Sequence, residues 1–268
     1  MLVSVVVPCF NEVEYMGNFL KNFFSHGITK FDVELIIADG ESDDGTKELL
    51  CEMEKYYSNL VVVANPERIV SCGLNRAIMR ASGEIVVRLD VHTTYAQNYI
   101  ENCVESLIST DAKCVGGPWK VFVPEKEGIP RAIALGFKSK IGSGSAKSRN
   151  MLFSGEVDTV YLGAWWKTDL IEVGLFDENL VRNQDDELCL RIRKLGGSIW
   201  QSADIKSTYY PRTNFITLFN QWLQYGYWRP VVIKKHRTTG ALRQLIPSFF
   251  VISIFLSFIF LVTAGSFL

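Results

Sequence analysis

The sequence predicts an α/β fold built on a mixed, mainly parallel sheet that is flanked by helices. Apolar runs typical of strands occur at residues 3–7, 34–38, 60–63 and 84–89, and helical patterns separate them at residues 14–24, 46–57 and 71–81. Strands that alternate with helices of this length indicate βαβ units and therefore parallel pairing. The first half of the chain is thus expected to be Rossmann-like, and the C-terminal end to add an interfacial helix and a transmembrane helix.

The size and composition of the chain limit its possible functions. With 268 residues, 48% of them hydrophobic, the chain can bury one sizeable α/β core but has little left for a second full domain. A formal net charge of −1 gives no overall attraction to nucleic acid, so no nucleic-acid partner is expected. The six cysteines form no CxxC pair, which favours a reducing, cytosolic compartment.

The first expected strand, residues 3–7, runs directly into Pro8 and Asn11. It is too short for a secretory signal and lacks the basic segment that precedes one. The sequence PCFNE occupies the first strand-to-helix turn, where dinucleotide-binding proteins carry a GxGxxG turn. A hydride-transfer enzyme is therefore disfavoured.

Two acidic clusters follow expected strands. Residues 39–44 come after the second strand, and residues 90–92 come after the fourth. Ligands of open α/β sheets bind beyond the carboxyl ends of the strands, so both clusters are expected to share one crevice for a nucleotide and a metal. Asp39 is suited to accept hydrogen bonds from a base, whereas Asp44 or Thr46 is suited to cap the next helix. The alternative for this cluster is a loop of turn-forming residues without a ligand.

Asp90 and His92 are two residues apart, so their side chains point the same way in an extended backbone. One carboxylate and one imidazole can hold a divalent cation and leave positions open for diphosphate oxygens. Because imidazole is a softer ligand than carboxylate, Mn²⁺ is at least as good a candidate as Mg²⁺.

A third acidic cluster, residues 184–187, opens a further expected helix. Carboxylates are favoured at a helix N-terminus by the macrodipole. Asp185 is the candidate for a general base that takes a proton from an attacking hydroxyl. The alternative is an acidic helix cap with no chemical role.

The region between the second and third clusters is less regular. Residues 114–123 are expected to form a strand broken by Gly116, Gly117 and Pro118. The polar loop at residues 138–150 has the length and composition of a mobile lid.

The C-terminal part has the composition of a membrane attachment. Residues 215–228 are rich in aromatic side chains and are interpreted either as an interfacial helix or as an amphipathic helix packed on the domain. Residues 244–268 carry no charge and exceed the ~20 apolar residues needed to span a bilayer. Basic residues at 234–243 are expected to stay cytoplasmic. The alternative for the last segment is a buried core helix.

Taken together, these motifs resemble glycosyltransferase family 2, the inverting nucleotide-sugar transferases of the GT-A fold. The resembling segments are residues 3–12 (VSVVVPCFNE), 39–46 (DGESDDGT), 90–92 (DVH, in the place of the family's metal-binding DxD) and 184–191 (QDDELCLR, in the place of its ED motif). The resemblance covers about residues 3–212. His92 stands where the family has a second Asp, and Gln184 where it has a Glu.

The resemblance implies a role for each motif residue. Nucleotide contacts are expected at Pro8, Phe10, Glu12, Asp39 and Asp90, with uracil as the expected base. Asp90 and His92 are expected to bind the metal, and Asp185 is expected to act as the catalytic base. Contacts to the sugar or the acceptor are expected at Gly163, Gln184, Asp186, Arg212 and Arg229. The implied cofactor is Mn²⁺ or Mg²⁺. The implied reaction is inverting transfer of glucose or a related hexose from a UDP-sugar.

Further motifs, RLDVHT, RNQDDEL, YYPR and QWLQYGYWR, resemble the subgroup that includes succinoglycan-type exopolysaccharide transferases. This resemblance implies a polyprenyl-diphosphate-linked acceptor at the cytoplasmic face of the inner membrane, with Arg212, Arg229 and Lys234 as candidates for the lipid diphosphate. The alternative is that these cations are attracted to anionic lipid headgroups without specificity. The implied organisation is a catalytic domain at 1–212, a membrane-interface segment at 213–243 and a transmembrane helix at 244–268.

Three other functions remain open on the sequence. A monosaccharide transferase acting on polyprenyl monophosphate would carry the same motifs. A processive polysaccharide synthase is disfavoured because a clear QxxRW motif is lacking. A non-catalytic nucleotide-binding membrane scaffold would bind UDP without turnover.

Overall fold

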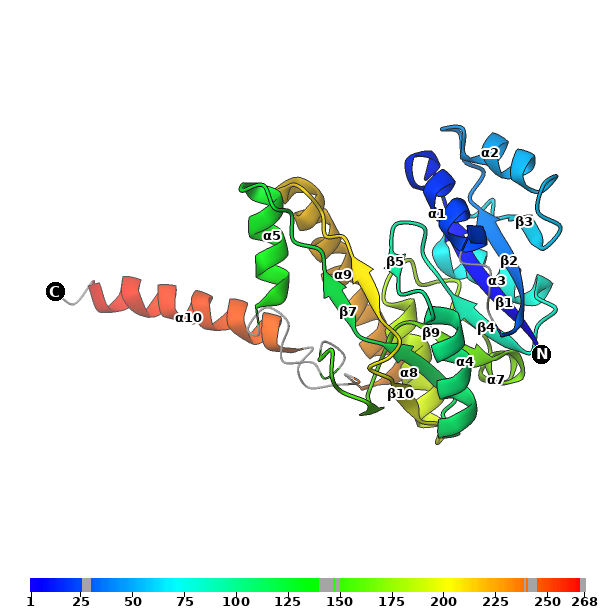
Figure 1. Cartoon of the computed structure of the whole chain (residues 1–268). Helices are drawn as coiled ribbons and strands as arrows, with labels where there is room; N and C mark the ends of the chain where they lie inside the picture. The colour runs from blue at the N-terminus through cyan, green and yellow to red at the C-terminus, as the bar shows by residue number, and fades with distance from the viewer. Residues whose placement is uncertain (26–29, 140–146, 148–149, 239, 241–244, 266–268) are drawn as a thin grey trace.

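The computed structural model describes residues 1–25, 30–139, 147, 150–238, 240 and 245–265. Within these ranges the centre is an eight-stranded sheet with the order β3-β2-β1-β4-β9-β6-β10-β8 (Figure 1). Its strands are β1 (Leu2–Cys9), β2 (Asp32–Asp39), β3 (Leu60–Ala64), β4 (Ile85–Arg88), β6 (Cys114–Gly117), β8 (Gly155–Glu156), β9 (Tyr161–Trp166) and β10 (Ile199–Gln201). The four strands expected in the first half are confirmed, each within two residues of its expected ends.

The sheet is mixed, as expected. Strands β1 to β4 pair in parallel, and β10 pairs in parallel with β6. Strand β9 lies antiparallel between β4 and β6, and β8 lies antiparallel to β10. Because β1, β2 and β4 are neighbours with one direction, their carboxyl ends meet at a single edge of the sheet.

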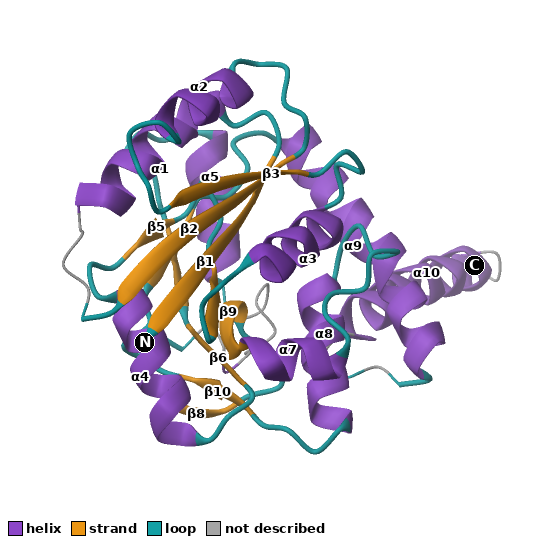
Figure 2. Cartoon of the chain, turned by 90° about the vertical axis from the view of Figure 1, so that its right-hand side faces the viewer, coloured by secondary structure: helices purple, strands orange, loops and turns teal. Residues whose placement is uncertain are grey.

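Helices cover both faces of the sheet (Figure 2). Val3, Val5 and Val7 of β1 point to one face, where they share a core with α1 (Val13–Ser25), α2 (Thr46–Met53) and α4 (Tyr99–Thr110). Val6 points to the other face and packs in the core of α3 (Val70–Arg80), α7 (Lys167–Val173) and α8 (Gln184–Lys194). Alternation along β1 therefore produces both cores.

A second, three-stranded sheet stands beside the main one. It has the order β5-β11-β7 and consists of β5 (Thr94–Tyr95), β11 (Ser207–Tyr209) and β7 (Trp119–Val121), with α5 (Ile129–Lys138) following β7. The expected break in the 114–123 segment is confirmed, since Pro118 separates β6 from β7. Gly117 is required there, because a Cβ atom would lie 1.6 Å from the carbonyl oxygen of Ile205.

The C-terminal part consists of α9 (Phe215–His236) and α10 (Ile246–Gly265). Figure 1 shows α9 against the body of the molecule and α10 projecting away from it. None of the helices in the described ranges combines the length and the apolarity that a membrane crossing requires. The transmembrane helix expected at 244–268 is therefore not confirmed, and residues 244 and 266–268 lie outside the described ranges. Most of the expected lid loop, at 140–146 and 148–149, also lies outside them.

Candidate active site

The structure brings the first two acidic clusters together at the carboxyl edge of β1, β2 and β4. Cys9, the last residue of β1, pairs with Asp39, the last residue of β2. Pro8 lies one residue earlier and pairs with Ala38. On the other side of β1, Val6 pairs with Arg88, the last residue of β4, and Asp90 follows within two residues.

Asp39 is almost fully buried and is held in one orientation. One carboxylate oxygen accepts hydrogen bonds from the Ser42 hydroxyl at 2.6 Å and from the Cys9 thiol at 3.6 Å, and the other accepts from the Ser42 amide at 3.1 Å. Burial, together with the charge of Asp39, raises the pKa of the Cys9 thiol, so this cysteine stays neutral.

Phe10 presents an aromatic surface next to Asp39. Its ring lies directly over Gly40, where a Cβ atom would come within 2.9 Å of it. The guanidinium carbon of Arg68 lies 4.9 Å from the ring centroid, within the range of a cation–π contact. Phe10 remains 39% exposed, so the ring is available to a planar group.

The remaining residues of the 39–46 cluster connect the first two strand-to-helix turns. Asp44 accepts hydrogen bonds from the amide of Thr46, the first residue of α2, and from the amide of Val13 at the start of α1. The N-cap position of α2 is occupied by Gly45 and not, as expected, by Asp44 or Thr46. Asn11 and Asp43 exchange two hydrogen bonds, at 2.9 and 3.0 Å. These carboxylates therefore fix the loop rather than face a ligand.

Arg88 lies at the centre of the site and joins the second and third clusters. Its guanidinium hydrogen-bonds Oδ1 of Asp90 at 3.2 and 3.3 Å and forms a short contact with Oδ1 of Asp185. The side chain is only 6% exposed. Burial disfavours this charge, but the two carboxylates outweigh it and raise the pKa of Arg88 above its ordinary value. Arg88 therefore holds the two acids in one network.

Asp185 is placed for proton transfer. It is the second residue of α8, and Asn183 precedes the helix in a left-handed conformation with φ 62°. Burial raises the pKa of Asp185 to about 6, the charge of Arg88 opposes the rise, and Asp90 and Asp186 add to it. At neutral pH the group is a carboxylate, yet it is a stronger base than an ordinary aspartate.

Asp90 and His92 lie at the same end of β4, and a third residue orients the histidine. Nδ1 of His92 is 3.4 Å from a carboxylate oxygen of Glu12. This hydrogen bond raises the pKa of His92, burial opposes it, and Asp90 adds to the rise. A histidine whose second nitrogen pairs with a carboxylate is the usual arrangement of a metal ligand.

The contacts described above use Oδ1 of Asp90 and Nδ1 of His92, so Oδ2 of Asp90 and Nε2 of His92 are the candidate ligand atoms for a cation. No group of three or more metal-binding side chains is gathered among the residues the structure describes. Two protein ligands with oxygen ligands from a diphosphate fit the preference of Mg²⁺ and Mn²⁺ for sites completed by substrate. The residues present therefore fit a divalent cation.

The expected sugar and acceptor residues are distributed around α8. Gln184 is buried at its first position. Asp186 accepts hydrogen bonds from the Thr159 hydroxyl at 2.9 Å and from Arg229 of α9. Arg229 thus supports the helix that carries Asp185. Arg212, in contrast, is exposed beside His92.

Gly163 lies in an irregular part of β9, where the pairing with β6 shifts register. Gly163 has φ 112°, and a Cβ atom would lie 2.5 Å from the Trp165 ring. Leu162 beside it also has a positive φ, 64°, which is rare for a branched residue. Tyr161 precedes this kink, and its hydroxyl lies 3.0 Å from the Thr93 hydroxyl.

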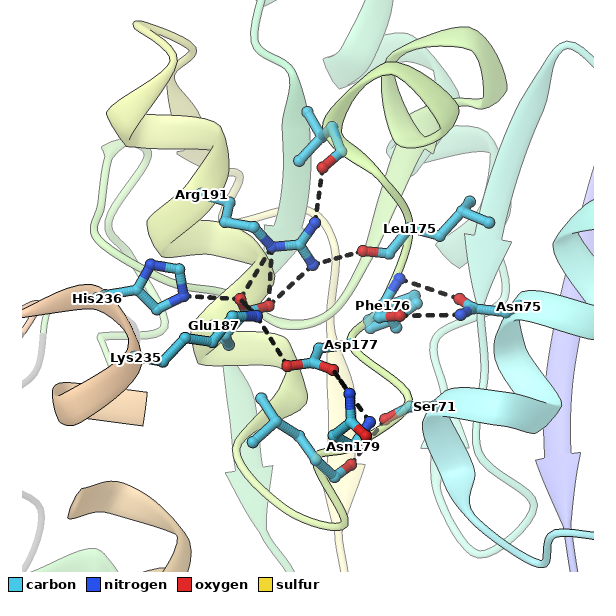
Figure 3. A network of polar contacts seen from close by, with 12 residues as sticks. Ser71, Asn75, Leu175, Phe176, Asp177, Asn179, Glu187, Arg191, Lys235 and His236 are labelled. Carbon is cyan, nitrogen blue, oxygen red and sulfur yellow. Dashed lines mark hydrogen bonds and ion pairs between the residues drawn. The ribbon is translucent and has the colours of Figure 1, made fainter. Parts of the chain in front are cut away.

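A buried ion-pair network anchors α8 to the end of α9 (Figure 3). Glu187, fully buried, accepts hydrogen bonds from Arg191 at 2.9 and 3.0 Å, from Lys235 at 2.7 Å and from His236 at 2.7 Å. Lys235 also pairs with Asp177 at 2.7 Å. Helix α9 is therefore fastened to α8 at two levels, through Arg229 and through this network.

Replacing Glu187 with glutamine should lower the free energy of unfolding by about 3 kcal/mol, because buried cations would lose their counter-charge. The loss falls at the lower end of the range for buried pairs because Lys235 is 41% exposed. Chemical denaturation measures the change. Glu67→Gln is the matched control, since the Glu67–Arg76 pair is about half exposed and should cost about 0–1 kcal/mol. Equal losses in the two variants would show that the network does not stabilise the fold.

Sequence reasoning missed Arg88, Glu187 and the pairing of Glu12 with His92. One signal was available for Arg88, which is a charged residue inside the apolar run 85–89. A buried charge of that kind needs carboxylate partners. Arg191 lies four residues after Glu187, a spacing typical of an ion pair within one helix. The other two partners of Glu187, Lys235 and His236, come from α9, 48 and 49 residues along the chain, and no local pattern indicates them.

Known proteins resemble this chain in sequence. Residues 4–162, more than half of the chain, match the family model described as "Glycosyl transferase family 2". The chain is 31% identical to the succinoglycan biosynthesis protein ExoA of Rhizobium meliloti, over 91% of this chain and 73% of that protein. It is 26% identical to a dolichyl N-acetyl-alpha-D-glucosaminyl phosphate 3-beta-D-2,3-diacetamido-2,3-dideoxy-beta-D-glucuronosyltransferase of Methanococcus voltae, over 87% of this chain and 74% of that protein.

Solved structures resemble the chain in fold. The mannosyltransferase PcManGT from Pyrobaculum calidifontis, in complex with GDP-Man and Mn²⁺, matches with a TM-score of 0.66 and 19% identity over 91% of this chain and 67% of that one. TarS residues 1–349 from S. aureus, in complex with UDP-GlcNAc, matches with a TM-score of 0.59 and 17% identity over 80% of this chain and 60% of that one. The expected mixed α/β architecture of GT-A type is thereby confirmed.

Proposed function

The chain belongs to glycosyl transferase family 2 and is a glycosyltransferase of nucleotide sugars, and from this premise we propose that it moves a hexose from a UDP-sugar to a polyprenyl-linked acceptor with inversion. The observation that carries the proposal is the contact of one buried arginine, Arg88, with both Asp90 and Asp185. The first acid lies where a donor diphosphate would bind, and the second is a base of raised pKa. Their common contact with Arg88 keeps both acids in one site, which suits a single displacement between donor and acceptor.

In this mechanism Asp185 takes the proton of the acceptor hydroxyl as the acceptor oxygen attacks the anomeric carbon. The bond between that carbon and the UDP oxygen breaks on the opposite side, which inverts the configuration. The proton remains on Asp185 until solvent removes it, and UDP departs. Arg88 holds the carboxylate in position, and Arg229 and Asn183 fix the start of α8.

A divalent cation fits Asp90 and His92, with Glu12 orienting the imidazole. Such an ion supplies charge stabilisation to the departing diphosphate. The Mn²⁺ in the PcManGT complex supports this part of the proposal, and the imidazole ligand makes Mn²⁺ at least as suitable as Mg²⁺.

The proposed donor site uses Asp39 and the Phe10 ring. The buried carboxylate is suited to accept a hydrogen bond from a base N–H, and the exposed ring is suited to lie against the nucleotide. Pro8 shapes the same edge of β1. The TarS complex with UDP-GlcNAc supports UDP as the nucleotide of the donor, whereas the PcManGT complex holds GDP-Man. The choice of uracil as the nucleotide base is therefore part of the proposal.

The proposed acceptor is lipid-linked, and the proposed location is the cytoplasmic face of the inner membrane. The name of the Methanococcus voltae relative includes a dolichyl phosphate, which supports a lipid-linked acceptor. Helix α9 exposes Ile216, Phe219 and Tyr227 at 75%, 65% and 68%, and the side chains of α10 are almost entirely apolar. Aromatic and apolar surfaces of this size are suited to a membrane interface.

The test is calorimetric titration of UDP into the protein with Mn²⁺, with Mg²⁺ and with neither, followed by an assay of UDP-sugar turnover. We expect metal-dependent UDP binding, and we expect His92→Ala to weaken it with either metal. Glu12→Gln should weaken it less, because the histidine keeps its ligand atom. UDP binding without any turnover of UDP-sugars would favour the non-catalytic scaffold, and metal-independent binding would refute the assignment of His92.

A further inference from the structure

A long cavity runs beneath the site along one face of the sheet. Its volume is about 1390 Å³, which exceeds the roughly 300–1,000 Å³ of ordinary small-molecule pockets. It is lined by Leu2 at the start of β1 and by Glu12 beyond the end of that strand. Eight strand residues at about 3.3 Å each correspond to a length of roughly 25 Å. The cavity is therefore a groove much longer than a single sugar.

The walls of the groove are largely aromatic and apolar. Helix α1 contributes side chains at the three- and four-residue spacing of one helical face: Tyr15, Asn18, Phe19, Asn22 and Phe23. The facing wall includes Tyr95, Tyr99 and Ile100, from β5 and α4. Helices α1 and α4 pack on the same face of the sheet, the face that carries Val3, Val5 and Val7. A chain with few polar groups would be accommodated along these walls.

The mouth of the groove has a different character. Glu12, His92 and Arg212 line it at the carboxyl edge of the sheet. Arg212 is exposed there and can contact a ligand phosphate. The groove thus combines an apolar length with a mouth that carries a cation, which is the complement of an amphiphile with an anionic head.

We propose that this α1–α4 groove holds the isoprenoid chain of the lipid-linked acceptor, with the acceptor's phosphate at Arg212. The inference rests on the proposed function, because that function supplies a lipid phosphate as substrate. The groove explains why an aromatic channel opens beside His92. It also places the lipid head beside His92, which lines the same mouth.

The test uses three soluble probes, geranyl, farnesyl and geranylgeranyl diphosphate, each longer than the last by one isoprenoid unit. Binding is measured by calorimetry below the concentration at which the probes form micelles. We expect the affinity to rise by about tenfold or more for each unit that enters the groove, since every buried methylene contributes. An affinity that is equal for the three probes would overturn the proposal.

Matched variants of α1 separate the groove from other apolar surfaces. Asn18→Trp places a bulky ring in the groove and should abolish the rise with chain length. Lys21→Trp adds the same ring at an exposed residue of α1 outside the groove, and should leave the rise intact. Equal behaviour of the two variants would show that the probes bind elsewhere, for example on α9 or α10.

Two further measurements test the phosphate contact at Arg212 and the proposed transferase reaction separately. Arg212→Ala should weaken all three probes by the same factor, because it removes a contact to the shared diphosphate. A chain-length dependence that Arg212→Ala abolishes would contradict the assignment of the head. UDP-sugar turnover is measured on the same samples: its absence together with chain-length-dependent binding would refute the proposed transferase reaction and leave the groove assignment standing.

Discussion

Replacing Asp185 with asparagine is expected to lower the rate of sugar transfer by about 10²–10⁴ and to leave the affinity for UDP unchanged. Asparagine has nearly the same shape and can still accept the hydrogen bond from Arg88, but it cannot take a proton. Transfer is measured as UDP release in the presence of acceptor, and UDP affinity by calorimetry. Near-full activity in this variant would show that Asp185 is not the base.

The pH dependence of the rate provides a second readout of Asp185. The reactive form is the carboxylate, and its pKa is raised to about 6. At saturating UDP-sugar and metal, the rate should therefore be constant above this pH and fall about tenfold per pH unit below it. The residual activity of Asp185→Asn should lack this fall. A wild-type rate that stays constant well below pH 6 would contradict the assignment.

The raised pKa of Asp185 also makes the free energy of unfolding depend on pH. Folding raises the pKa of Asp185 from 3.8 to about 6, so the folded state binds this proton more tightly. The stabilisation from this group is present below pH 3.8 and is lost as the pH rises through about 6. Asp185→Asn should remove this contribution to the pH dependence of the free energy of unfolding, which denaturation at several pH values measures.

Replacing Arg88 with glutamine is expected to reduce activity by at least about 10² and to lower the free energy of unfolding by about 3–5 kcal/mol. The reason is that Asp90 and Asp185 would lose the buried cation that they share. Arg88→Lys should recover only part of both losses, because one ammonium group cannot reproduce the fork of a guanidinium.

The pH profile distinguishes a positioning role of Arg88 from a purely structural one. The charge of Arg88 lowers the pKa of Asp185, so Arg88→Gln should shift the acid fall of the rate to higher pH. Arg76→Gln removes an exposed arginine of an ion pair and serves as the control, with no shift expected. A destabilised Arg88→Gln variant with an unchanged pH profile would show that Arg88 acts only on stability.

The sequence predicted those parts of the molecule that depend on local pattern. Alternating apolar runs and helical stretches located the four parallel strands, and the strand ends brought Asp39 and Asp90 to one edge, because parallel strands must end together. The break at Pro118 followed from the residue itself. These features are encoded within a few residues of where they appear.

Other features depend on contacts that no local pattern reveals. Arg88 joins Asp90 and Asp185 because α8 packs back against the sheet, although Asp185 lies 97 residues after Arg88 in the sequence. The contact between Arg229 and Asp186 arises because α9 packs back on α8, and the sequence pattern did not indicate it. The expectation that Arg229 binds the lipid diphosphate stays a prediction. The left-handed conformation of Leu162 arises from the register shift between β6 and β9.

The two sets of ion pairs between α9 and α8 determine where the protein can be truncated without losing them. A protein cut after residue 212, the expected end of the catalytic domain, would lose Arg229, the partner of Asp186. It would also lose Lys235 and His236, so that Arg191 would be the one cation left to Glu187 among the ion pairs described above. A cut between α9 and α10 would keep every one of these contacts and remove only the projecting apolar helix. A shortened protein that keeps these ion pairs should therefore end after His236.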